Sequence, residues 1–438
     1  MSTNTIQAHS TNELKGKKLL ILGASVSEVV LVRRAQSFGV YVITTDNHLN
    51  YDLAPAKKVS DEAWDISWSD IDALEKKCVQ EHVDGITAGY SEIRVDCLIS
   101  LCKRLDKPCF CTKEQLEITR DKARFKEECK KYGVPVVKDY ISVEDVDSFP
   151  VIVKPVDRGG SLGVGIAWNK DELLGAYKTA METSLKGSVI IEDYITKATE
   201  IDIHYAIING DIQLLTTNDI IQAKRNVEDA KVVQSAWMYP SKYNKEILDS
   251  ADSSLRAMIS GMGINDGTIF FSGFADTEGR VSFFESGYRL WGEQEFGYDY
   301  IQNGINYLDL YILYAITGGT TGIPRNSDPN PNIKGIAVNL YVTGGTICEA
   351  WGFDKLNNMQ DCYLCLHDSQ IGKECSFDAA ILYKAGLIGF ANNDAEKLRR
   401  DVIEAYSQIH IVNESGIDML YDHIDTDCVA DWWKEAEH

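Results

Sequence analysis

The sequence predicts a multidomain protein of the α/β and α+β classes, with a parallel α/β domain first. Its 438 residues exceed what one hydrophobic core normally covers, and 44% hydrophobic with 25% charged residues is ordinary globular composition. Short apolar runs alternate with amphipathic segments at the start, which favours parallel strands covered by helices. Turn motifs between longer apolar runs predict antiparallel hairpins further along.

The first predicted domain spans residues 17–112 and follows a flexible N-terminus at 1–16. The runs KKLLILGA and VYVITTD are predicted strands, with a helix between them that extends through Arg34. A helix near 71–80, the strand DGITAG and a helix at 93–104 complete the series. This alternation predicts a small parallel sheet with helices on both faces.

The turn GASVSE after the first strand leaves a second interpretation open, a dinucleotide site with Asp46 as the ribose acid. That fingerprint requires a second glycine where the backbone meets the pyrophosphate. Here the corresponding positions are Ser25 and Glu28. A tight strand-to-helix turn is therefore favoured over an NAD-dependent dehydrogenase.

The second predicted domain spans residues 113–330 and begins with one polar, lysine-rich helix. The segment TKEQLEITRDKARFKEECKKYGVP starts at Thr112 and its helix stops at Gly133. A mobile lid subdomain is expected at about 125–195, built from paired strands, a helix and the strand VIIEDYI. Further hairpins turn at Asn209-Gly210 and at the segment DTEG.

Residues 151–165, VIVKPVDRGGSLGVG, are the most informative segment for function. An apolar run ends in Lys154, and a loop with several glycines follows before a second apolar stretch. Glycines let the backbone approach an anion and point N–H groups at it, while the lysine supplies a point charge. The segment favours a loop that covers the phosphates of a nucleoside triphosphate, although a plain mobile turn would show the same glycines.

Other residues could complete a nucleotide site. Lys122 could reach the same phosphates from another wall, and the strand bearing Glu192 would suit an adenine slot. Glu200, on the next strand, could accept hydrogen bonds from ribose hydroxyls. In FFESGYRLWGE, Glu285 could hold Mg²⁺, and Arg289 could neutralise charge on a transferred phosphoryl group.

The order of these motifs resembles the ATP-grasp ligases, the superfamily that includes biotin carboxylase, D-alanine:D-alanine ligase and the carbamoyl phosphate synthetases. The resemblance covers nearly the whole chain. It implies a parallel pre-grasp domain, an ATP-grasp fold of two α+β subdomains, and a small C-terminal domain at 331–438 that contains NESGIDML. It also implies ATP, Mg²⁺ and a substrate carboxylate that becomes an acyl phosphate, which an amine then opens.

The resemblance further implies a role for each motif residue. Lys154 and Arg289 would be catalytic, Arg289 by steadying the acyl phosphate, and Glu285 would bind the metal. The nucleotide would contact two lysines, the closing loop, the adenine hinge and the ribose acid: Lys122 and Lys154; Gly159, Gly160, Ser161, Leu162 and Gly163; Glu192, Asp193 and Ile195; and Glu200.

Two departures from the family pattern concern the metal. The usual E-x-N motif is Glu285-Ser286-Gly287 here, which lacks the asparagine oxygen. On the preceding strand, where the family has an acid, the chain has Ser272 or Gly273, depending on the turn. A non-catalytic ATP-binding sensor is therefore the alternative to a ligase.

Charge and cysteine usage limit the partners. A formal charge of -22 would repel nucleic acid and anionic membranes, and the eleven scattered cysteines fit a reducing cytoplasm. Packing explains Cys362, Cys365, His367 and Cys375 better than a metal knuckle does. The expected partners are ATP, a small carboxylate and an amine, and a homodimer is one arrangement that the resemblance allows.

Two groups of residues bear on the unidentified substrates. Lys224 and Arg225 could hold a substrate carboxylate, although solvated charges are the favoured interpretation. An aromatic pocket is conceivable as well, although core packing is favoured for each of its members: Trp237, Tyr239, Tyr288 and Trp291.

Overall fold

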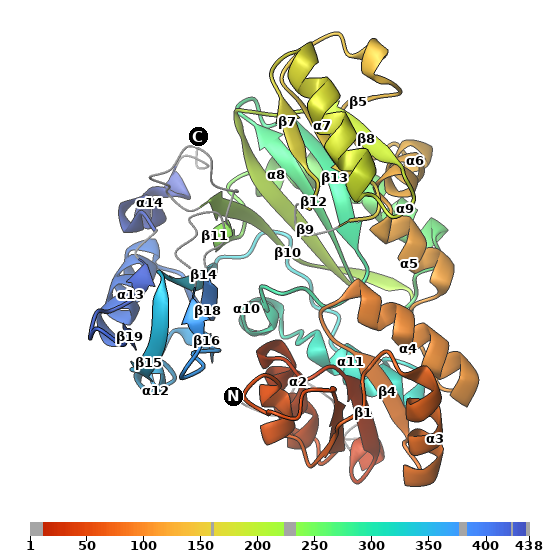
Figure 1. Cartoon of the computed structure of the whole chain (residues 1–438), viewed down its shortest axis with the longest axis vertical. Helices are drawn as coiled ribbons and strands as arrows, with labels where there is room; N and C mark the ends of the chain where they lie inside the picture. The colour runs from red at the N-terminus through yellow and green to blue at the C-terminus, as the bar shows by residue number, and fades with distance from the viewer. Residues whose placement is uncertain (1–11, 159–161, 223–233, 376–382, 422–423, 435–438) are drawn as a thin grey trace.

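The computed structural model describes residues 12–158, 162–222, 234–375, 383–421 and 424–434 (Figure 1). Leu14 is fully buried, so packed structure begins before residue 17. No helix among the described residues has the length and apolar character that crossing a membrane requires. The predicted domain boundaries remain proposals, because the largest sheet continues across the boundary predicted between residues 330 and 331.

The N-terminal region is a parallel sheet in the order β3-β2-β1-β4, which confirms the predicted α/β fold. Each predicted strand and helix between residues 17 and 104 is present, within three residues of its expected ends. The elements are β1 (Lys18–Leu22), α2 (Val26–Ser37), β2 (Tyr41–Thr45), η1 (Pro55–Lys58), β3 (Glu62–Trp64), α3 (Ile71–Glu81), β4 (Gly85–Ala88) and α4 (Glu92–Leu105).

The predicted single helix after Thr112 is two helices, α5 (Lys113–Arg120) and α6 (Lys122–Tyr132). Asp121 ends the first helix in an extended conformation, and its carboxylate accepts hydrogen bonds from the N–H groups of Ala123 and Arg124. This N-cap restarts the chain as a new helix. The predicted stop at Gly133 is confirmed, because Gly133 adopts the left-handed conformation with φ of 72°.

A four-stranded sheet follows in the order β5-β8-β6-β7, and it lies at the top of the view in Figure 1. Its elements are β5 (Asp139–Tyr140), η2 (Val143–Asp145), β6 (Val151–Pro155), β7 (Gly165–Ala167), α7 (Lys170–Thr183) and β8 (Val189–Asp193). Helix α7 covers one face and closes a small core of its own around Val151 and Leu173. Strands β6 and β7 pair antiparallel, which confirms the predicted strand and returning strand.

The largest sheet has nine strands in the order β13-β12-β9-β10-β11-β14-β18-β16, with β20 beside β14. The two predicted hairpins are present, and Asn209 and Gly210 have φ of 50° and 80°, as such a turn requires. The strands are β9 (Ala198–Ile208), β10 (Asp211–Gln222), β11 (Gln234–Tyr239), β12 (Gly267–Asp276), β13 (Val281–Gly287), β14 (Lys334–Val342), β16 (Cys362–His367), β18 (Tyr383–Asn392) and β20 (Leu420–Tyr421). Because β11 pairs with β14, one sheet continues from the predicted second domain into the C-terminal hundred residues.

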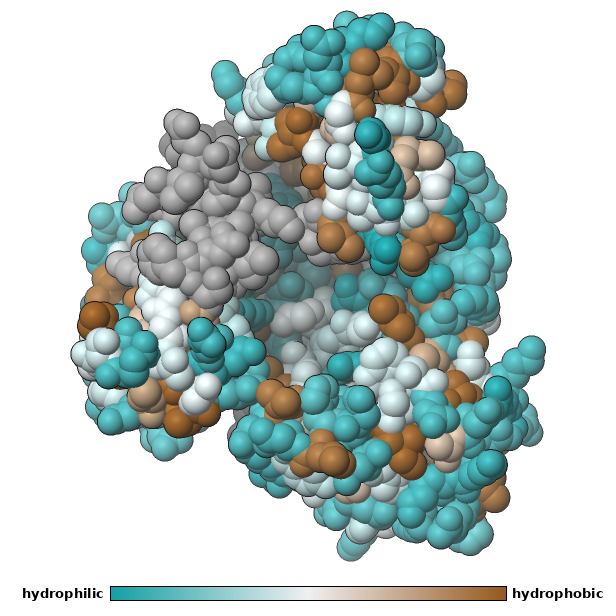
Figure 2. Space-filling view, in the orientation of Figure 1, coloured by the Kyte–Doolittle hydropathy of each residue, from teal (hydrophilic) through white to brown (hydrophobic). Residues whose placement is uncertain are grey.

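Helices and a small sheet complete the chain. The helices are α8 (Asn244–Ile247), η3 (Leu248–Asp252), α9 (Ser253–Gly261), α10 (Phe296–Asn303), α11 (Leu308–Thr317), α12 (Phe353–Leu356), α13 (Ala395–Gln408) and α14 (Thr426–Asp431), and the sheet joins β17 (Glu374–Cys375), β15 (Gly345–Trp351) and β19 (His410–Asn413). Helix α11 packs on the N-terminal sheet, where Arg34 donates two hydrogen bonds to Asp309 at 2.6 and 2.7 Å. The surface is hollowed at the centre of the view in Figure 2, between the upper, lower and left-hand parts.

Candidate functional site

Lys154 is held in place by a buried glutamate. The Glu192 carboxylate is 1% exposed and lies between the ammonium groups of Lys154, at 2.8 Å, and Lys126. Burial alone would raise the pKa of Glu192, but the two lysines outweigh it and lower that pKa. Because Glu192 stays ionised, it fixes Lys154 at the end of β6.

Lys122 lies beside the glycine loop that follows β6. It is the first residue of α6, and its Nζ donates to the carbonyl of Arg158 at 2.9 Å. Gly159, Gly160 and Ser161 lie outside the described residues. Leu162 is 50% exposed, and Gly163 has φ of 75°, where a Cβ would lie 2.6 Å from the Thr183 side chain. Gly163 is therefore required on both steric and conformational grounds.

The predicted adenine hinge is largely engaged within the β5–β8 sheet. Tyr140 donates to the Asp193 carboxylate at 2.6 Å, and the Asp193 N–H donates to the carbonyl of Lys138. Ile195 follows the end of β8 and is partly buried. The adenine roles of these residues remain predictions, and the structure adds that the Glu192 side chain points to two lysines.

Carboxylates line one face of the nine-stranded sheet. On β9, Glu200 and Asp202 alternate and so share a face. The strand register places Asp202 opposite Ser272, and Ser272 opposite Glu285 on β13. Ser272 is thus the residue across from Glu285, and its hydroxyl donates to Asp202 at 2.5 Å. Asp202 is not among the residues predicted from the sequence, although the alternation E-I-D-I-H contains the signal.

These carboxylates lie close enough to influence one another. Burial, followed by the charges of Asp202 and Glu285, raises the pKa of Glu200 to about 7. Burial also raises the pKa of Glu285, against the lowering effect of Lys122 and Lys154. Glu285 is therefore near both lysines as well as near the other acids. Within the described part of the chain, its carboxylate makes no hydrogen bond or ion pair that would prevent it from binding a cation.

Arg289 stands at the junction of the large sheet and the N-terminal region. Its Nε donates to Glu92, at the start of α4, over 2.8 Å, and its guanidinium lies over the Phe270 ring at 5.2 Å. Lys122 and Lys154 lie near Glu285, and Arg289 is linked to it through Glu92, whose charge also acts on Glu285. Lys224 and Arg225 lie outside the described residues.

The donor set fits one hard divalent cation shared with a polyanion. Glu285 and Asp202 offer carboxylate oxygens, and Mg²⁺ takes few protein ligands when phosphates and water supply the rest. Groups of three or more side chains arranged to hold a metal are absent from the described ranges. Around the predicted cysteine cluster, His367 stacks on Phe353 at 4.0 Å and Cys365 bonds to the Phe353 carbonyl, so these side chains pack.

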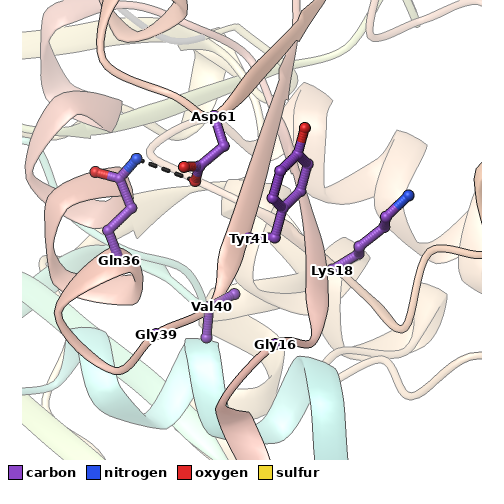
Figure 3. Close-up of a pocket in the computed structure, with 7 residues that line it drawn as sticks. All are labelled: Gly16, Lys18, Gln36, Gly39, Val40, Tyr41 and Asp61. Carbon is purple, nitrogen blue, oxygen red and sulfur yellow. Dashed lines mark hydrogen bonds between the residues drawn. The ribbon is translucent and has the colours of Figure 1, made fainter.

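A separate surface pocket of about 460 Å³ lies at the edge of the N-terminal sheet (Figure 3). It is lined by the start of β1 and β2, and ligands of open parallel sheets bind at the opposite, carboxyl ends of the strands. Its Gln36 and Asp61 side chains hydrogen bond to each other at 3.1 Å. At the carboxyl end of β1, the Glu28 carboxylate pairs with Arg94 and accepts a hydrogen bond from the Ser25 N–H, so that N–H is already engaged within the turn.

A parallel α/β region, a hairpin subdomain carrying Lys154 and an antiparallel sheet carrying acids together define the ATP-grasp class of nucleotide-binding proteins. Comparisons with known proteins agree. A protein-family model described as D-ala D-ala ligase C-terminus matches residues 124–261.

Curated relatives match the chain in part. A D-alanine–D-alanine ligase of Fusobacterium nucleatum is 29% identical over 38% of this chain and 55% of its own length. A formate-dependent phosphoribosylglycinamide formyltransferase of Nostoc is 31% identical over 42% of this chain and 49% of its own length. The chain therefore spans about half the length of these relatives.

Solved structures match nearly the whole chain. The biotin carboxylase domain dimer of Hydrogenobacter thermophilus 2-oxoglutarate carboxylase, in complex with MgADP, ADP and bicarbonate, has a TM-score of 0.75 at 18% identity and covers 96% of this chain and 94% of its own. An L-amino acid ligase from Bacillus licheniformis has a TM-score of 0.70 at 17% identity, over 91% and 99%. The chain therefore has the ATP-grasp fold over nearly its whole length, and residues 124–261 match the D-ala D-ala ligase model.

Proposed function

We propose that this protein is an ATP-dependent ligase that phosphorylates a small-molecule carboxylate and couples the acyl group to an amine. The observation that carries the proposal is that Lys122 and Lys154 lie near enough to Glu285 to lower its pKa, while Arg289 pairs with Glu92, whose charge also acts on Glu285. Cations that surround one acid suit a nucleotide and a phosphoryl group in transfer. The named ligases among the relatives support the same reaction class.

In the proposed site, Lys154 and Lys122 hold the α- and β-phosphates. Glu192 has a positioning role, since it holds Lys154 in one place. The segment from Gly159 to Gly163 closes over the phosphates, Asp193 and Ile195 belong to the adenine hinge, and Glu200 accepts hydrogen bonds from the ribose.

Glu285 would hold Mg²⁺, with Asp202 as the second carboxylate. The metal, when bound, neutralises charge on the phosphate oxygens. Asp202 would take the place of the acid expected on the preceding strand, where Ser272 stands, and Gly287 supplies no side-chain oxygen in place of the asparagine.

The chemical step then needs no protein nucleophile. A substrate carboxylate oxygen attacks the γ-phosphorus, and the bond to the β-γ bridging oxygen breaks, which gives the acyl phosphate and ADP. Arg289 stabilises the charge on the transferred group and on the acyl phosphate. An amine then attacks the acyl carbon and phosphate leaves, so the products are an amide, ADP and phosphate.

The proposal also covers the domains, the cellular location and the oligomeric state. The region around 125–195 acts as the lid over ATP, within a grasp region at 113–330 that follows residues 17–112 and precedes 331–438. The protein acts in the cytoplasm. A homodimer is supported by the dimeric biotin carboxylase domain among the structural neighbours, and sedimentation velocity tests it.

Trapping of the acyl phosphate tests the reaction class. The protein is incubated with MgATP, hydroxylamine and a panel of carboxylates that includes all the protein amino acids. Acid-dependent formation of hydroxamate and ADP is expected, and Lys154→Met should abolish it. Lys138→Met, an exposed lysine of the same subdomain paired with Asp147, is the control and should keep activity.

A non-catalytic ATP sensor is favoured by a single feature, the serine opposite Glu285. It predicts ATP binding by calorimetry with neither hydroxamate nor ADP from any acid in the panel. A thermal shift with NAD and none with ATP would instead contradict nucleotide binding of the proposed kind.

A further inference from the structure

Two buried carboxylates beside the proposed active site have no lysine or arginine partner among the described residues. Glu295 and Asp299 are both fully buried, and all four of their carboxylate oxygens lack a hydrogen-bond partner among the described residues. An isolated charge in such a place is strongly unfavourable, and buried acids are normally paired or bound to a cation. These two residues therefore call for a ligand or a proton.

The local backbone places the Glu295 and Asp299 side chains on the same side of α10. Glu295 caps α10 and Asp299 lies one turn later, with its N–H bonded to the Glu295 carbonyl at 2.9 Å, so both side chains share one face of the helix. The preceding residue, Gln294, is 1% exposed, has φ of 58° and leaves its Oε1 unpartnered among the described residues. A left-handed glutamine is a strained conformation, of a kind that collects at binding sites.

Four tyrosine hydroxyls from separate parts of the chain lie near enough to Glu295 for its charge to act on them. They come from the end of β4, from β11, from the residue before α11 and from β16, and all four are buried without a partner in the described structure: Tyr90, Tyr239, Tyr307 and Tyr363. Burial is the main reason that the pKa of each is raised, and the charge of Glu295 contributes in every case. We refer to these tyrosines with Glu295 and Asp299 as the Glu295 cluster.

The cluster is continuous with the proposed metal and phosphate site. His204, the next inward-facing residue of β9 after Asp202, has its Nε2 at 3.9 Å from both Asp202 and Glu295. Its ring lies 4.4 Å from Trp291, which in turn lies 4.6 Å from Tyr307. His204 also contacts Phe270, the ring beneath Arg289. A substrate that spans Arg289 and the cluster would thus reach both groups.

The chemistry of the cluster selects an organic cation. Carboxylates and tyrosine oxygens accept hydrogen bonds, and the faces of Trp291 and Tyr307 attract positive charge. An ammonium group supplies one charge and three donors, which match these acceptors. A bare metal ion would use the oxygens but gain little from the aromatic walls, and an anion would be repelled.

We propose that the Glu295 cluster binds the ammonium group of the amine substrate. The inference rests on the proposed ligase function and deepens it, since it assigns the second substrate to a position and limits its class to amines that arrive protonated. The ammonium gives one proton to a cluster carboxylate before its nitrogen attacks the acyl carbon, and the second proton leaves with the phosphate. Glu295 and Asp299 are the residues that carry it. The aromatic side chains would set the size of the group next to the nitrogen.

The test uses the full chain with isosteric variants, Glu295→Gln and Asp299→Asn. Asp401→Asn is the matched control, because Asp401 is also a buried acid with one unpartnered oxygen, but it lies on α13 and pairs with Lys397. Thermal unfolding is followed with methylammonium, tetramethylammonium or potassium chloride at matched ionic strength. Methylammonium should raise the melting temperature of the wild type and the control, and it should raise that of the two variants by much less.

Turnover of an accepted carboxylate with a panel of primary amines in place of hydroxylamine provides the second readout. In both variants the KM for the amine should rise by about 10- to 100-fold, as expected for a lost charged hydrogen bond, while acid-dependent hydroxamate formation persists. An equal methylammonium response in Glu295→Gln and wild type would overturn the inference. A melting-temperature shift with potassium equal to that with methylammonium would also overturn it, because it indicates a metal site. Lower ligand-free stability of both variants with an unchanged KM for the amine would overturn it too, because it indicates that the acids are structural.

Failure of the inference is distinguishable from failure of the proposed function. If no acid yields hydroxamate or ADP, the ligase reaction is wrong, whatever the cluster binds. If hydroxamate forms but the KM for the amine and the methylammonium shift are the same in both variants as in the wild type, the ligase reaction stands and the amine binds elsewhere.

Discussion

Two of the buried glutamates of this protein, Glu192 and Glu295, have opposite surroundings. Glu192, in the β5–β8 sheet, is enclosed by two lysines and has a lowered pKa. Glu295, at the start of α10, has an acid and tyrosines for neighbours, and burial and the nearby Glu293 and Asp299 raise its pKa well above the usual value. Similar burial thus gives opposite ionisation behaviour.

The difference separates two uses of a buried carboxylate. A paired acid is complete within the fold, so its task is to place a cation, here Lys154. A buried acid without a counterion lowers the free energy of unfolding, and a bound cationic ligand can remove that penalty. Substitutions of the paired acid, of the lysine it places and of the unpaired acids test this difference.

The largest effect is expected at the cation that Glu192 places. Lys154→Met should lower acid-dependent ADP release by about 10³-fold, because a preorganised charge next to the phosphates is lost. Steady-state kinetics with MgATP measure it, and Lys138→Met supplies the reference. Activity within tenfold of the wild type would contradict a phosphate role for Lys154.

Removal of the paired acid itself should act on stability first. Glu192→Gln leaves Lys126 and Lys154 buried without a counterion, and breaking a buried ion pair typically lowers the free energy of unfolding by about 3–5 kcal/mol. Urea unfolding at pH 7 measures the change.

The pH dependence of stability shows whether the effect of Glu192→Gln comes from the loss of charge pairing. Because the folded pKa of Glu192 is lowered, its contribution to stability is present above the unfolded pKa and is lost as pH falls through the folded pKa. The gap between wild type and Glu192→Gln should therefore narrow below about pH 4. A gap that stays constant down to pH 3 would show that charge pairing is not the cause.

The unpaired acids should show the opposite sign. Their folded pKa values are raised, so the ligand-free protein loses stability as pH rises from about 4 toward neutrality. Glu295→Gln and Asp299→Asn remove that loss, and at pH 7 each should melt about 2–4 °C above the wild type. Scanning calorimetry at pH 4.5 and 7 measures this, and Asp401→Asn should show no such gain.

The sequence predicts one of these two regions much better than the other. Lys154 lies in a local motif, strand, glycine loop and strand, whose spacing is readable in fifteen residues. The partner of Glu192 is less visible, since Lys126 sits in a polar helix where most lysines are solvated, and only the fold brings it to β8. The break of that helix at Asp121 was also a local signal, because aspartate is a favoured N-cap.

The Glu295 cluster could not be predicted from local pattern. Its tyrosines stand at positions 90, 239, 307 and 363, and they meet only because the N-terminal sheet, the large sheet and its C-terminal extension converge. Each residue alone reads as ordinary aromatic core. What reveals the cluster is the lack of partners at buried polar atoms, a property of tertiary packing.

The smallest effect is expected at Glu200, which lies between the two regions on β9 and combines features of both. Burial and the neighbouring acids raise its pKa to about 7, so it is partly protonated at neutral pH. If its carboxylate accepts hydrogen bonds from the ribose, nucleotide binds best to the ionised form, and affinity should rise about three- to tenfold between pH 6 and 8. Calorimetric titration with ADP, without metal, measures this, and Glu200→Gln should flatten the dependence. If the slope survives in that variant, another group is responsible, and Asp202 then becomes the next residue to replace because its charge already acts on Glu200.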